Sequence, residues 1–295
     1  MDAGSTWELR VAFDLRPCLG LNEEVPFATA AGNHRVHFQT FGSPNNPALV
    51  LIQGLMLDGR FWFQLPEMLA NDPDQPWFVI VPDNRGVGQS AMPTRPWTMA
   101  DMADDVAAVL DAVGVQRAVV TGISMGGMIA QQVALRHPRR VAGLLLMATW
   151  PGLPYGKLPP LKTLNVLIDS AIRKPKTIDH LAHLLLPEHL HANANELLRD
   201  WVNLMREAAP TRKTFLGQFA AISTHSTGHR LERIQAPVRV VTGDEDRLVP
   251  PRTSEVLASR IRGAGLEVLP RVGHAIPLLD RQVVHRNVAR LRAAM

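Results

Sequence analysis

Short apolar segments recur along the chain and alternate with segments whose apolar residues are spaced for one face of a helix. The apolar segments are four to six residues long and lie at Ala48–Ile52, Trp77–Val81, Ala118–Thr121, Ala142–Met147 and Val238–Thr242. Segments of this length, without polar alternation, are typical of strands that are covered on both faces. The pattern therefore predicts an α/β fold with a parallel sheet covered by helices.

Four segments between and after these strands have helical character. Thr98 precedes the first, Asp101 follows three residues later as in a capping box, and Gly114 ends the helix. The others are expected at Gly126–His137, Pro251–Arg262 and Asp280–Met295. Each of these helices is long enough to cover part of one face of the sheet.

Residues 150–229 interrupt the alternation of strands and helices. The segment opens with a stretch rich in proline and glycine that is typical of a linker. Helical patterns follow at Leu161–Ile172, Ile178–Leu186, Glu196–Ala208 and Lys213–Ser223, and no strand pattern occurs before Pro237. We expect an all-helical cap at residues 150–229, inserted into a core of residues 1–149 and 230–295. A cap inserted there would lie over the carboxyl edge of the sheet and form the wall of a ligand pocket.

The composition and charge are those of a globular chain, and they exclude several classes of binding partner. The 295 residues are 46% hydrophobic and 20% charged, which is too apolar for a disordered chain. The net charge is +4 without a long run of like charges, so we expect no nucleic-acid partner. Cys18 is the single cysteine, which excludes an intramolecular disulfide and a cysteine-based zinc site. No signal peptide or transmembrane stretch is visible, which predicts a soluble cytoplasmic protein without a membrane partner.

One motif points to nucleophilic catalysis. Gly122-Ile-Ser124-Met-Gly126 directly follows the predicted strand Ala118–Thr121 and opens the next predicted helix. A strand, a tight turn and a helix are the setting of a nucleophile elbow, in which the serine backbone is strained. Side chains at Gly122 and Gly126 would collide in such a turn. Ser124 is therefore predicted to present its hydroxyl above the carboxyl edge of the sheet.

A serine hydroxyl needs a base, and the base needs a carboxylate that orients it. His274 lies in a loop between the strand-like Leu266–Leu269 and the last helix, where a base is expected. The loop after Val238–Thr242 offers three carboxylates, Asp244, Glu245 and Asp246. Serine, acid and histidine then follow one another in the chain order expected for this architecture.

Together these motifs resemble the α/β-hydrolase fold family, from about residue 25 to the C-terminus. The resemblance is carried by the elbow, by the turn at residues 83–90, by the segment at residues 243–250 and by Gly273-His274. It implies a mostly parallel central sheet of about eight strands. It also implies that Asp246, four residues before Pro250, is the catalytic acid. The most similar motifs are those of cofactor-free esterases and lactonases.

The resemblance further implies an oxyanion hole made by two backbone N–H groups. Met125 in the elbow supplies one, and Leu55, in the loop after Ala48–Ile52, supplies the other. Gln53 stands where family members commonly have histidine, and Met56 stands where many have proline.

The sequence thus predicts a serine hydrolase that cleaves carboxylic esters or lactones through Ser124, His274 and Asp246. No metal or cofactor is expected, and the expected partner is a small-molecule ester or lactone. The apolar insertion favours a medium-sized hydrophobic or cyclic substrate. Two alternatives stay open: an acyltransferase, thioesterase, perhydrolase or C–C bond hydrolase with the same triad, and a slow-turnover ligand receptor on the same fold. The sequence leaves a homo-oligomer open.

Overall fold

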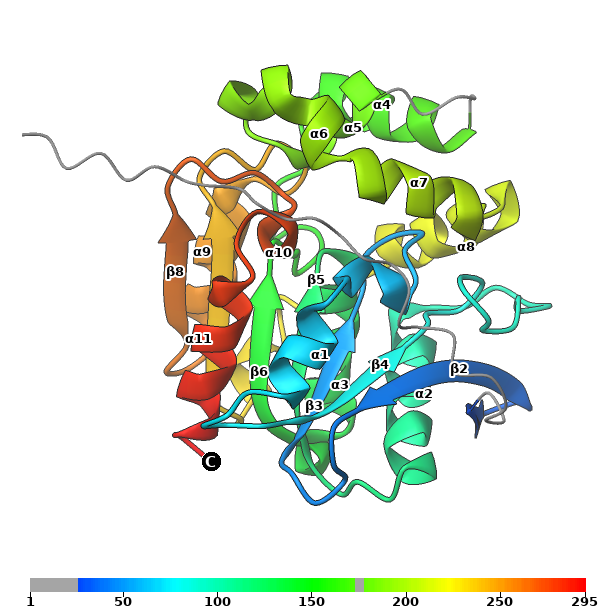
Figure 1. The fold of residues 1–295 in the computed structure, drawn as a ribbon, viewed down its shortest axis with the longest axis vertical. Helices are drawn as coiled ribbons and strands as arrows, with labels where there is room; N and C mark the ends of the chain where they lie inside the picture. Colours follow the sequence, from blue (N-terminus) through cyan, green and yellow to red (C-terminus); the bar gives the residue numbers. More distant parts are fainter. Residues whose placement is uncertain (1–25, 173–177) are drawn as a thin grey trace, which may run out of the picture.

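An eight-stranded sheet separates two layers of helices (Figure 1). The computed structural model describes residues 26–172 and 178–295, so Cys18 lies outside the described residues. The strands are β1 Phe27–Ala30, β2 His34–Phe41, β3 Ala48–Ile52, β4 Phe78–Pro82, β5 Ala118–Ile123, β6 Val141–Met147, β7 Val238–Gly243 and β8 Gly265–Leu269. Their order is β1-β2-β4-β3-β5-β6-β7-β8, antiparallel from β1 to β4 and parallel from β4 to β8. This mostly parallel sheet confirms the predicted fold class.

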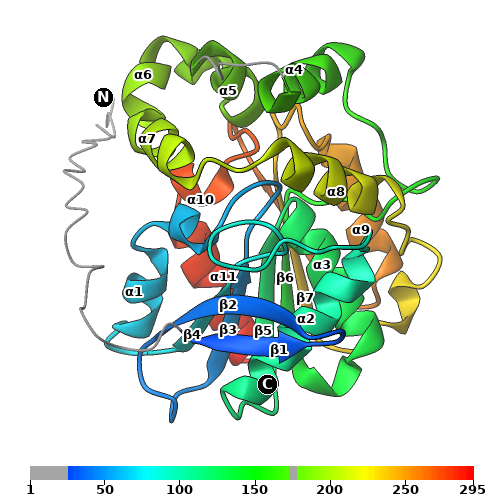
Figure 2. The ribbon, with the colours of Figure 1, turned by 90° about the vertical axis from the view of Figure 1, so that its right-hand side faces the viewer.

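Helices cover both faces of the sheet (Figure 2). One face packs against α1 Leu65–Ala70 and α11 Gln282–Arg292, which is preceded by the short α10 Ile276–Leu279. The other face packs against α2 Met99–Ala112, α3 Met125–Arg136 and α9 Pro251–Arg260. The predicted capping box of α2 is confirmed, with Thr98 as the N-cap and Asp101 bonded back to it.

The burial of β3 explains why its sequence is apolar throughout. Leu49 and Leu51 belong to the cluster that contains side chains of α1 and α11. Val50 and Ile52 belong to the cluster on the opposite face, with side chains of α2 and α3. All four side chains are fully buried. Because successive side chains of a strand point to opposite faces, a strand covered on both sides needs apolar residues at every position.

Several elements differ from the predicted ones. The sequence patterns did not predict β1, β2 or α1, and the expected helix at Asp280–Met295 is present with shorter bounds, as α11 Gln282–Arg292. Asp280 has an extended backbone, with φ −148° and ψ 97°. Its carboxylate accepts a hydrogen bond from Gln282 N, so Asp280 precedes α11 instead of lying inside it. The expected helix at Glu196–Ala208, by contrast, is divided into two helices, α6 Ala194–Leu197 and α7 Arg199–Ala208.

The helices between β6 and β7 lie above the ends of the strands toward which the arrowheads of β6 and β8 point (Figure 1). They are α4 Leu161–Ile172, α5 Ile178–Leu185, α6, α7 and α8 Arg212–Ser223, and the described residues between β6 and β7 contain no strand. Buried side chains of α5, α6 and α7, such as Leu184 and Trp201, form one cluster with Phe61 and Ala275 of the remaining chain. These helices therefore have an apolar core that extends onto the sheet's carboxyl edge. The boundaries of core and cap as separate domains stay a prediction.

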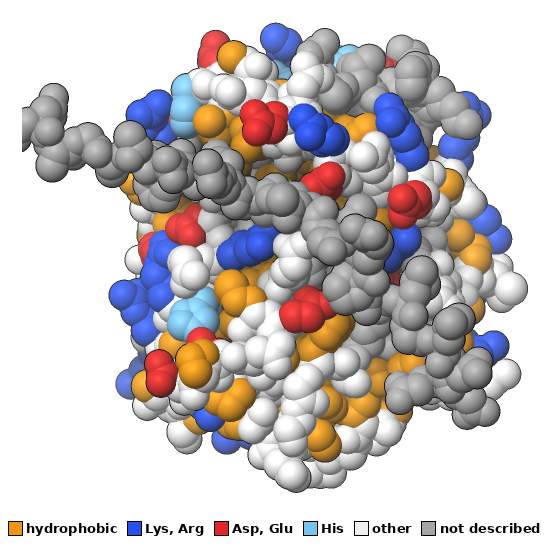
Figure 3. Space-filling model, in the orientation of Figure 1, with side chains coloured by type: hydrophobic (Ala, Val, Ile, Leu, Met, Phe, Trp, Pro, Cys, Tyr) orange, Lys and Arg blue, Asp and Glu red, His pale blue; other side chains and the backbone are white. Residues whose placement is uncertain are grey.

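Charged and apolar side chains share the one face of the molecule that Figure 3 shows. On the face shown in Figure 3, basic, acidic and hydrophobic groups are interspersed. Large exposed apolar side chains include Leu161 in α4 and Leu216 in α8. In residues 26–172 and 178–295, no helix has both the length and the hydropathy needed to cross a membrane.

Two neighbouring aspartates of α2 form ion pairs of similar geometry but different burial. Asp105 accepts two hydrogen bonds from Arg85, at 2.6 Å from Nε and 2.8 Å from Nη2, and the two side chains are only 6% and 4% exposed. Asp104 accepts from Arg136 at 2.9 Å and 2.7 Å, with side chains 32% and 40% exposed, and also contacts His137. The buried pair anchors the turn at residues 83–90 to α2.

We predict that Asp105→Ala lowers the free energy of unfolding by about 3–5 kcal/mol, because it leaves the Arg85 guanidinium buried without a counter-charge. The matched variant Asp104→Ala should cost about 1 kcal/mol or less, since water screens an exposed pair. Urea unfolding followed by circular dichroism measures both values. Equal losses in the two variants would contradict the assigned role of the buried pair.

Candidate active site

Ser124 lies in a sharply bent backbone between β5 and α3. Its φ of 54° and ψ of −121° fall in a region that is disfavoured for residues with a side chain. A Cβ atom on Gly122 would lie 2.2 Å from the carbonyl oxygen of Gly126. A Cβ atom on Gly126 would lie 2.1 Å from the carbonyl oxygen of Ile52. The predicted steric reason for both glycines is therefore present in the structure.

Hydrogen bonds from β6 and the residues after it hold the bend. Ser124 N donates to the carbonyl oxygen of Met147 at 2.9 Å. Thr149 Oγ1 donates to the carbonyl oxygen of Ser124 at 2.6 Å. No sequence motif marks Thr149, so the sequence did not predict this contact. Thr149 is fully buried, and its hydroxyl helps to hold the Ser124 carbonyl in the strained turn.

The structure brings His274 and Asp246 together from two different loops. His274 Nδ1 lies 2.8 Å from Asp246 Oδ2. The other carboxylate oxygen, Oδ1, accepts hydrogen bonds from Leu248 N at 2.9 Å and from Val249 N at 2.8 Å. The Asp246 side chain is 0% exposed and that of His274 is 6% exposed. The carboxylate is therefore fixed in place by its own loop and is directed at one side of the imidazole.

The neighbouring carboxylate Asp244 has a different environment. It is exposed, and its Oδ1 accepts a hydrogen bond from Arg271 N at 2.6 Å. That contact joins the β7 loop to the β8 loop without involving the His274 ring. Of the three candidate acids in this loop, Asp246 is the one whose carboxylate bonds to His274.

A cavity of about 390 Å³ opens above these residues. Ser124 and His274 line it together with Gln53, Gly54 and Leu55 of the loop after β3. Most of the remaining wall is apolar and comes from the cap helices and the segments that lead to them: Trp150, Leu153, Leu158, Pro159, Leu164, Leu167, Leu181, Leu184, Leu185, Trp201, Met205, Phe215, Phe219 and Ile222. Lys157 adds one ammonium group to this wall.

Two backbone N–H groups beside Ser124 have no acceptor among the described residues. Gly54 N donates to the side chain of Gln53 at 3.1 Å, and Met56 N donates to the side chain of Gln218 at 2.8 Å. Leu55 N, between them, has no hydrogen bond, and neither has Met125 N at the start of α3, within the part of the chain that the structure describes. These are the two groups predicted for an oxyanion hole. Gln53, in place of the family's usual histidine, bonds within its own loop.

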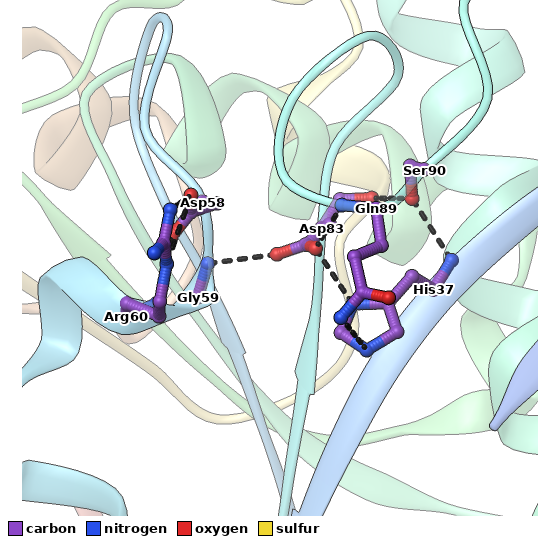
Figure 4. Close-up of polar contacts among 7 residues, drawn as sticks. All are labelled: His37, Asp58, Gly59, Arg60, Asp83, Gln89 and Ser90. Carbon is purple, nitrogen blue, oxygen red and sulfur yellow. Dashed lines mark hydrogen bonds and ion pairs between the residues drawn. The ribbon is translucent and has the colours of Figure 1, made fainter. Parts of the chain in front are cut away.

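Figure 4 shows a second buried pair of histidine and aspartate, His37 and Asp83. Neither residue lines the cavity. His37 Nδ1 is 2.6 Å from Asp83 Oδ2, and Asp83 Oδ1 accepts from Gly59 N at 2.8 Å. Ser90 Oγ donates to the Asp83 carbonyl oxygen at 2.7 Å and accepts from His37 N at 2.9 Å. The Ser90 hydroxyl is engaged with backbone groups and not with the imidazole, so it is not placed as a nucleophile beside His37. The hydrogen bonds of the cluster join β2, the 83–90 turn and the loop after β3. The cluster is a structural junction.

His274 is distinguished from the other histidines by its position. All eleven histidines lie within the described residues, and His274 alone lines the cavity. His225, for example, is buried beyond α8, where burial lowers its pKa to about 4 and keeps it neutral. Among the described residues, no group of three histidine, cysteine, aspartate or glutamate side chains is placed to hold a metal ion.

Comparison with known proteins identifies the family. A family model described as the alpha/beta hydrolase fold matches residues 47–280. The match covers most of the chain and includes the elbow, the 244–246 loop and the His274 loop. The chain therefore belongs to the alpha/beta hydrolase fold family, as the resemblance implied.

Individual relatives are hydrolases of several kinds. RutD of Caulobacter vibrioides (strain NA1000 / CB15N), a carbamate hydrolase by name, is 31% identical over 255 residues, 83% of this chain and 90% of RutD. The 2-hydroxy-6-oxononadienedioate/2-hydroxy-6-oxononatrienedioate hydrolase of Burkholderia vietnamiensis (strain G4 / LMG 22486) is 30% identical over 247 residues, 81% of this chain and 84% of that protein. The solved structure of Est816, described as an N-acyl homoserine lactone degrading enzyme, is 28% identical, with a TM-score of 0.73 over 90% of this chain and 99% of Est816. The relatives define the class of enzyme, and they differ in the bond that is cleaved.

Proposed function

We propose that this protein hydrolyses carboxylic esters or lactones that carry an apolar acyl group. The observation that carries the proposal is the arrangement of Ser124, His274 and Asp246 at the cavity. Ser124 and His274 face the same apolar cavity, and Asp246 bonds to the ring of His274 at 2.8 Å. A nucleophile, a base and an orienting carboxylate are the parts that acyl transfer requires.

In the first half of the proposed reaction, Ser124 Oγ attacks the carbonyl carbon while His274 Nε2 accepts the hydroxyl proton. The carbonyl oxygen becomes an oxyanion and accepts hydrogen bonds from Leu55 N and Met125 N, which have no other acceptor among the described residues. The bond to the leaving oxygen then breaks, and His274 returns the proton to that oxygen. The acyl group remains on Ser124, and an alcohol, or the free hydroxyl end of an opened lactone, results.

Water completes the cycle. His274 removes a proton from a water molecule, whose oxygen attacks the acyl carbon, and Ser124 leaves with the proton that His274 holds. Asp246 accepts from His274 Nδ1 throughout, which fixes the tautomer with a free Nε2 and stabilises the imidazolium. The proton transfers need no group beyond Ser124, His274, Asp246 and water.

The cavity wall supports an apolar substrate of medium size. Leucine, tryptophan and phenylalanine side chains form most of the wall, and such pockets bind the apolar part of a ligand. No carboxylate lines the cavity in the described residues, and Lys157 is the one lining ammonium. A cationic ester would therefore meet a like charge, whereas a neutral or distally anionic ester would not.

The relatives' substrates fit this cavity to different degrees. A small carbamate would leave most of 390 Å³ unfilled. A dienedioate brings two carboxylates, and the described wall offers one ammonium, on Lys157. An N-acyl homoserine lactone combines an uncharged lactone with an acyl chain, which suits an apolar wall. These comparisons support the lactone or ester reading over the other two.

A panel of substrates tests the proposal as a whole. Esters, lactones, thioesters, a carbamate and a vinylogous diketone, each assayed with and without an added alcohol acceptor, separate hydrolysis from acyl transfer and C–C cleavage. Product release that is linear in time and in enzyme with esters or lactones supports the proposal. A single stoichiometric burst without further turnover would indicate a receptor on the hydrolase fold instead.

Ser124→Ala should lower kcat for p-nitrophenyl butyrate by a factor on the order of 10⁶, because no other group can form the acyl-enzyme. Its circular dichroism spectrum and melting temperature should match the wild type, since alanine keeps the Cβ and loses only the hydroxyl. Activity above a few per cent of the wild type would show that Ser124 is not the nucleophile.

Asp246→Asn should lower kcat by about 10⁴-fold, because the amide favours the wrong imidazole tautomer and cannot stabilise the imidazolium. Asp244→Asn is the matched control, since its carboxylate bonds only to a backbone N–H of the next loop. That variant should keep nearly full activity. If the two substitutions reduce kcat equally, the assignment of the acid within residues 244–246 is wrong.

Leu164→Trp should narrow the cavity and lower the ratio of kcat/KM for octanoate over acetate esters. One methylene of pocket contact is worth about 1–3 kcal/mol, so the ratio should fall by roughly 10- to 200-fold. Leu161 lies one turn earlier in α4, is 78% exposed and does not line the cavity, so Leu161→Trp is the matched control. Both variants should react normally with a small fluorophosphonate. An unchanged chain-length ratio in Leu164→Trp would argue against an acyl pocket walled by the cap.

A further inference from the structure

The loop after β3 is held between the sheet and a cap helix. From the sheet side, Asn84 Nδ2 donates to the Gln53 carbonyl oxygen at 2.9 Å, and Asp83 Oδ1 accepts from Gly59 N at 2.8 Å. From the cap side, Gln218 of α8 accepts from Met56 N at 2.8 Å through Oε1. The backbone that carries Leu55 N therefore has supports on two sides, and one of them comes from outside the catalytic core.

Gln218 also bonds to the 83–90 turn, whose Asn84 supports the loop after β3. Its Nε2 donates to the Arg85 carbonyl oxygen at 3.0 Å. Because Met56 N must meet an acceptor and the Arg85 carbonyl must meet a donor, the two backbone groups determine which way the amide points. The Gln218 side chain is fully buried, so water does not replace either bond. One side chain thus links α8, the 83–90 turn and the loop after β3.

Met56 has a backbone conformation that depends on its hydrogen bond to Gln218. Its φ is 64°, in the left-handed region that is sparsely populated by residues other than glycine. Such a conformation persists only when the surroundings hold it. The bond from Met56 N to Gln218 lies directly after Leu55 and so constrains the peptide group that follows the predicted oxyanion donor. A change in that peptide group would alter the backbone of Leu55, whose N–H is the predicted oxyanion donor.

Two neighbouring faces of α8 have different roles. Phe215, Phe219 and Ile222 line the cavity, at the spacing of one helical face. Thr214, Gln218 and Ala221 lie one position before them and are buried. Thr214 Oγ1 donates to the Gly86 carbonyl oxygen at 2.8 Å, so two polar side chains one turn apart dock α8 on the 83–90 turn.

We propose that Gln218 is a positioning residue for the oxyanion hole: it holds the Met56 peptide in its left-handed conformation and thereby keeps Leu55 N directed at the carbonyl oxygen of the substrate. The effect on catalysis rests on the proposed function, whereas the effect on the loop does not. The role also makes α8 a fixed part of the site, because α8 cannot move away without breaking the bonds of Gln218 and Thr214.

The test compares Gln218→Met with Thr214→Val. Each variant removes buried hydrogen bonds between α8 and the 83–90 turn and keeps a similar side-chain volume, but only Gln218→Met frees Met56 N. Hydrogen–deuterium exchange of the peptide that contains residues 53–58 reports the loop directly. Steady-state kinetics with p-nitrophenyl butyrate report its consequence. Gln218→Glu, which retains an oxygen acceptor for Met56 N and loses the amide donor to the Arg85 carbonyl, is the conservative variant that tests for rescue.

We expect faster exchange at residues 53–58 in Gln218→Met and wild-type exchange there in Thr214→Val. We expect kcat of Gln218→Met to fall by roughly 10- to 100-fold with KM changed by about twofold at most, because a misdirected donor acts on the transition state. Gln218→Glu should recover part of the lost kcat. The same exchange rates, or the same kcat, in the two matched variants would overturn the inference. Altered exchange in a protein that hydrolyses no ester would overturn the proposed function alone.

Discussion

The left-handed backbone at Ser124 is the constraint on which the rest of the site depends. A residue with a side chain adopts φ 54° only where its surroundings hold it there. Here the close approach of Gly122 to Gly126 and the bond from Thr149 Oγ1 to the Ser124 carbonyl provide that support. The bend separates β5 from α3 within a single residue and leaves Met125 N, the first N–H of α3, without an acceptor in the described chain.

The sequence was most informative where both faces of an element are buried. β3, whose bounds were predicted correctly, is fully buried, and its apolar pattern is continuous for that reason. β1 and β2 were missed because they form the antiparallel end of the sheet, where Arg35, His37 and Gln39 alternate with Val36 and Phe38 and leave no continuous apolar segment. The start of α11 was predicted two residues too early, because an aspartate that accepts a hydrogen bond from the first helical N–H also suits a first helical turn.

Local motifs and distant contacts contributed differently to the site. Ser124 and His274 stand in short motifs, and the structure places both at one cavity, with Asp246 bonded to His274. Gln218 stands in no motif and acts on Met56 across 162 positions of the chain. Thr149 and Asn84 are similar cases, since each bonds to a backbone group that is distant in sequence. Side chains that hold backbone carbonyls and N–H groups depend on tertiary geometry, which hydrophobic periodicity does not encode.

The central claim is a covalent acyl-enzyme on Ser124, and rapid acid quenching tests it most directly. Wild-type protein mixed with excess p-nitrophenyl butyrate is quenched within the first turnover, digested and analysed by mass spectrometry. We predict one butyryl group per chain, on the peptide that contains Ser124, formed as fast as the burst of p-nitrophenol and absent when Ser124→Ala is used. Full turnover without any adduct, or an adduct on another residue, would contradict the account.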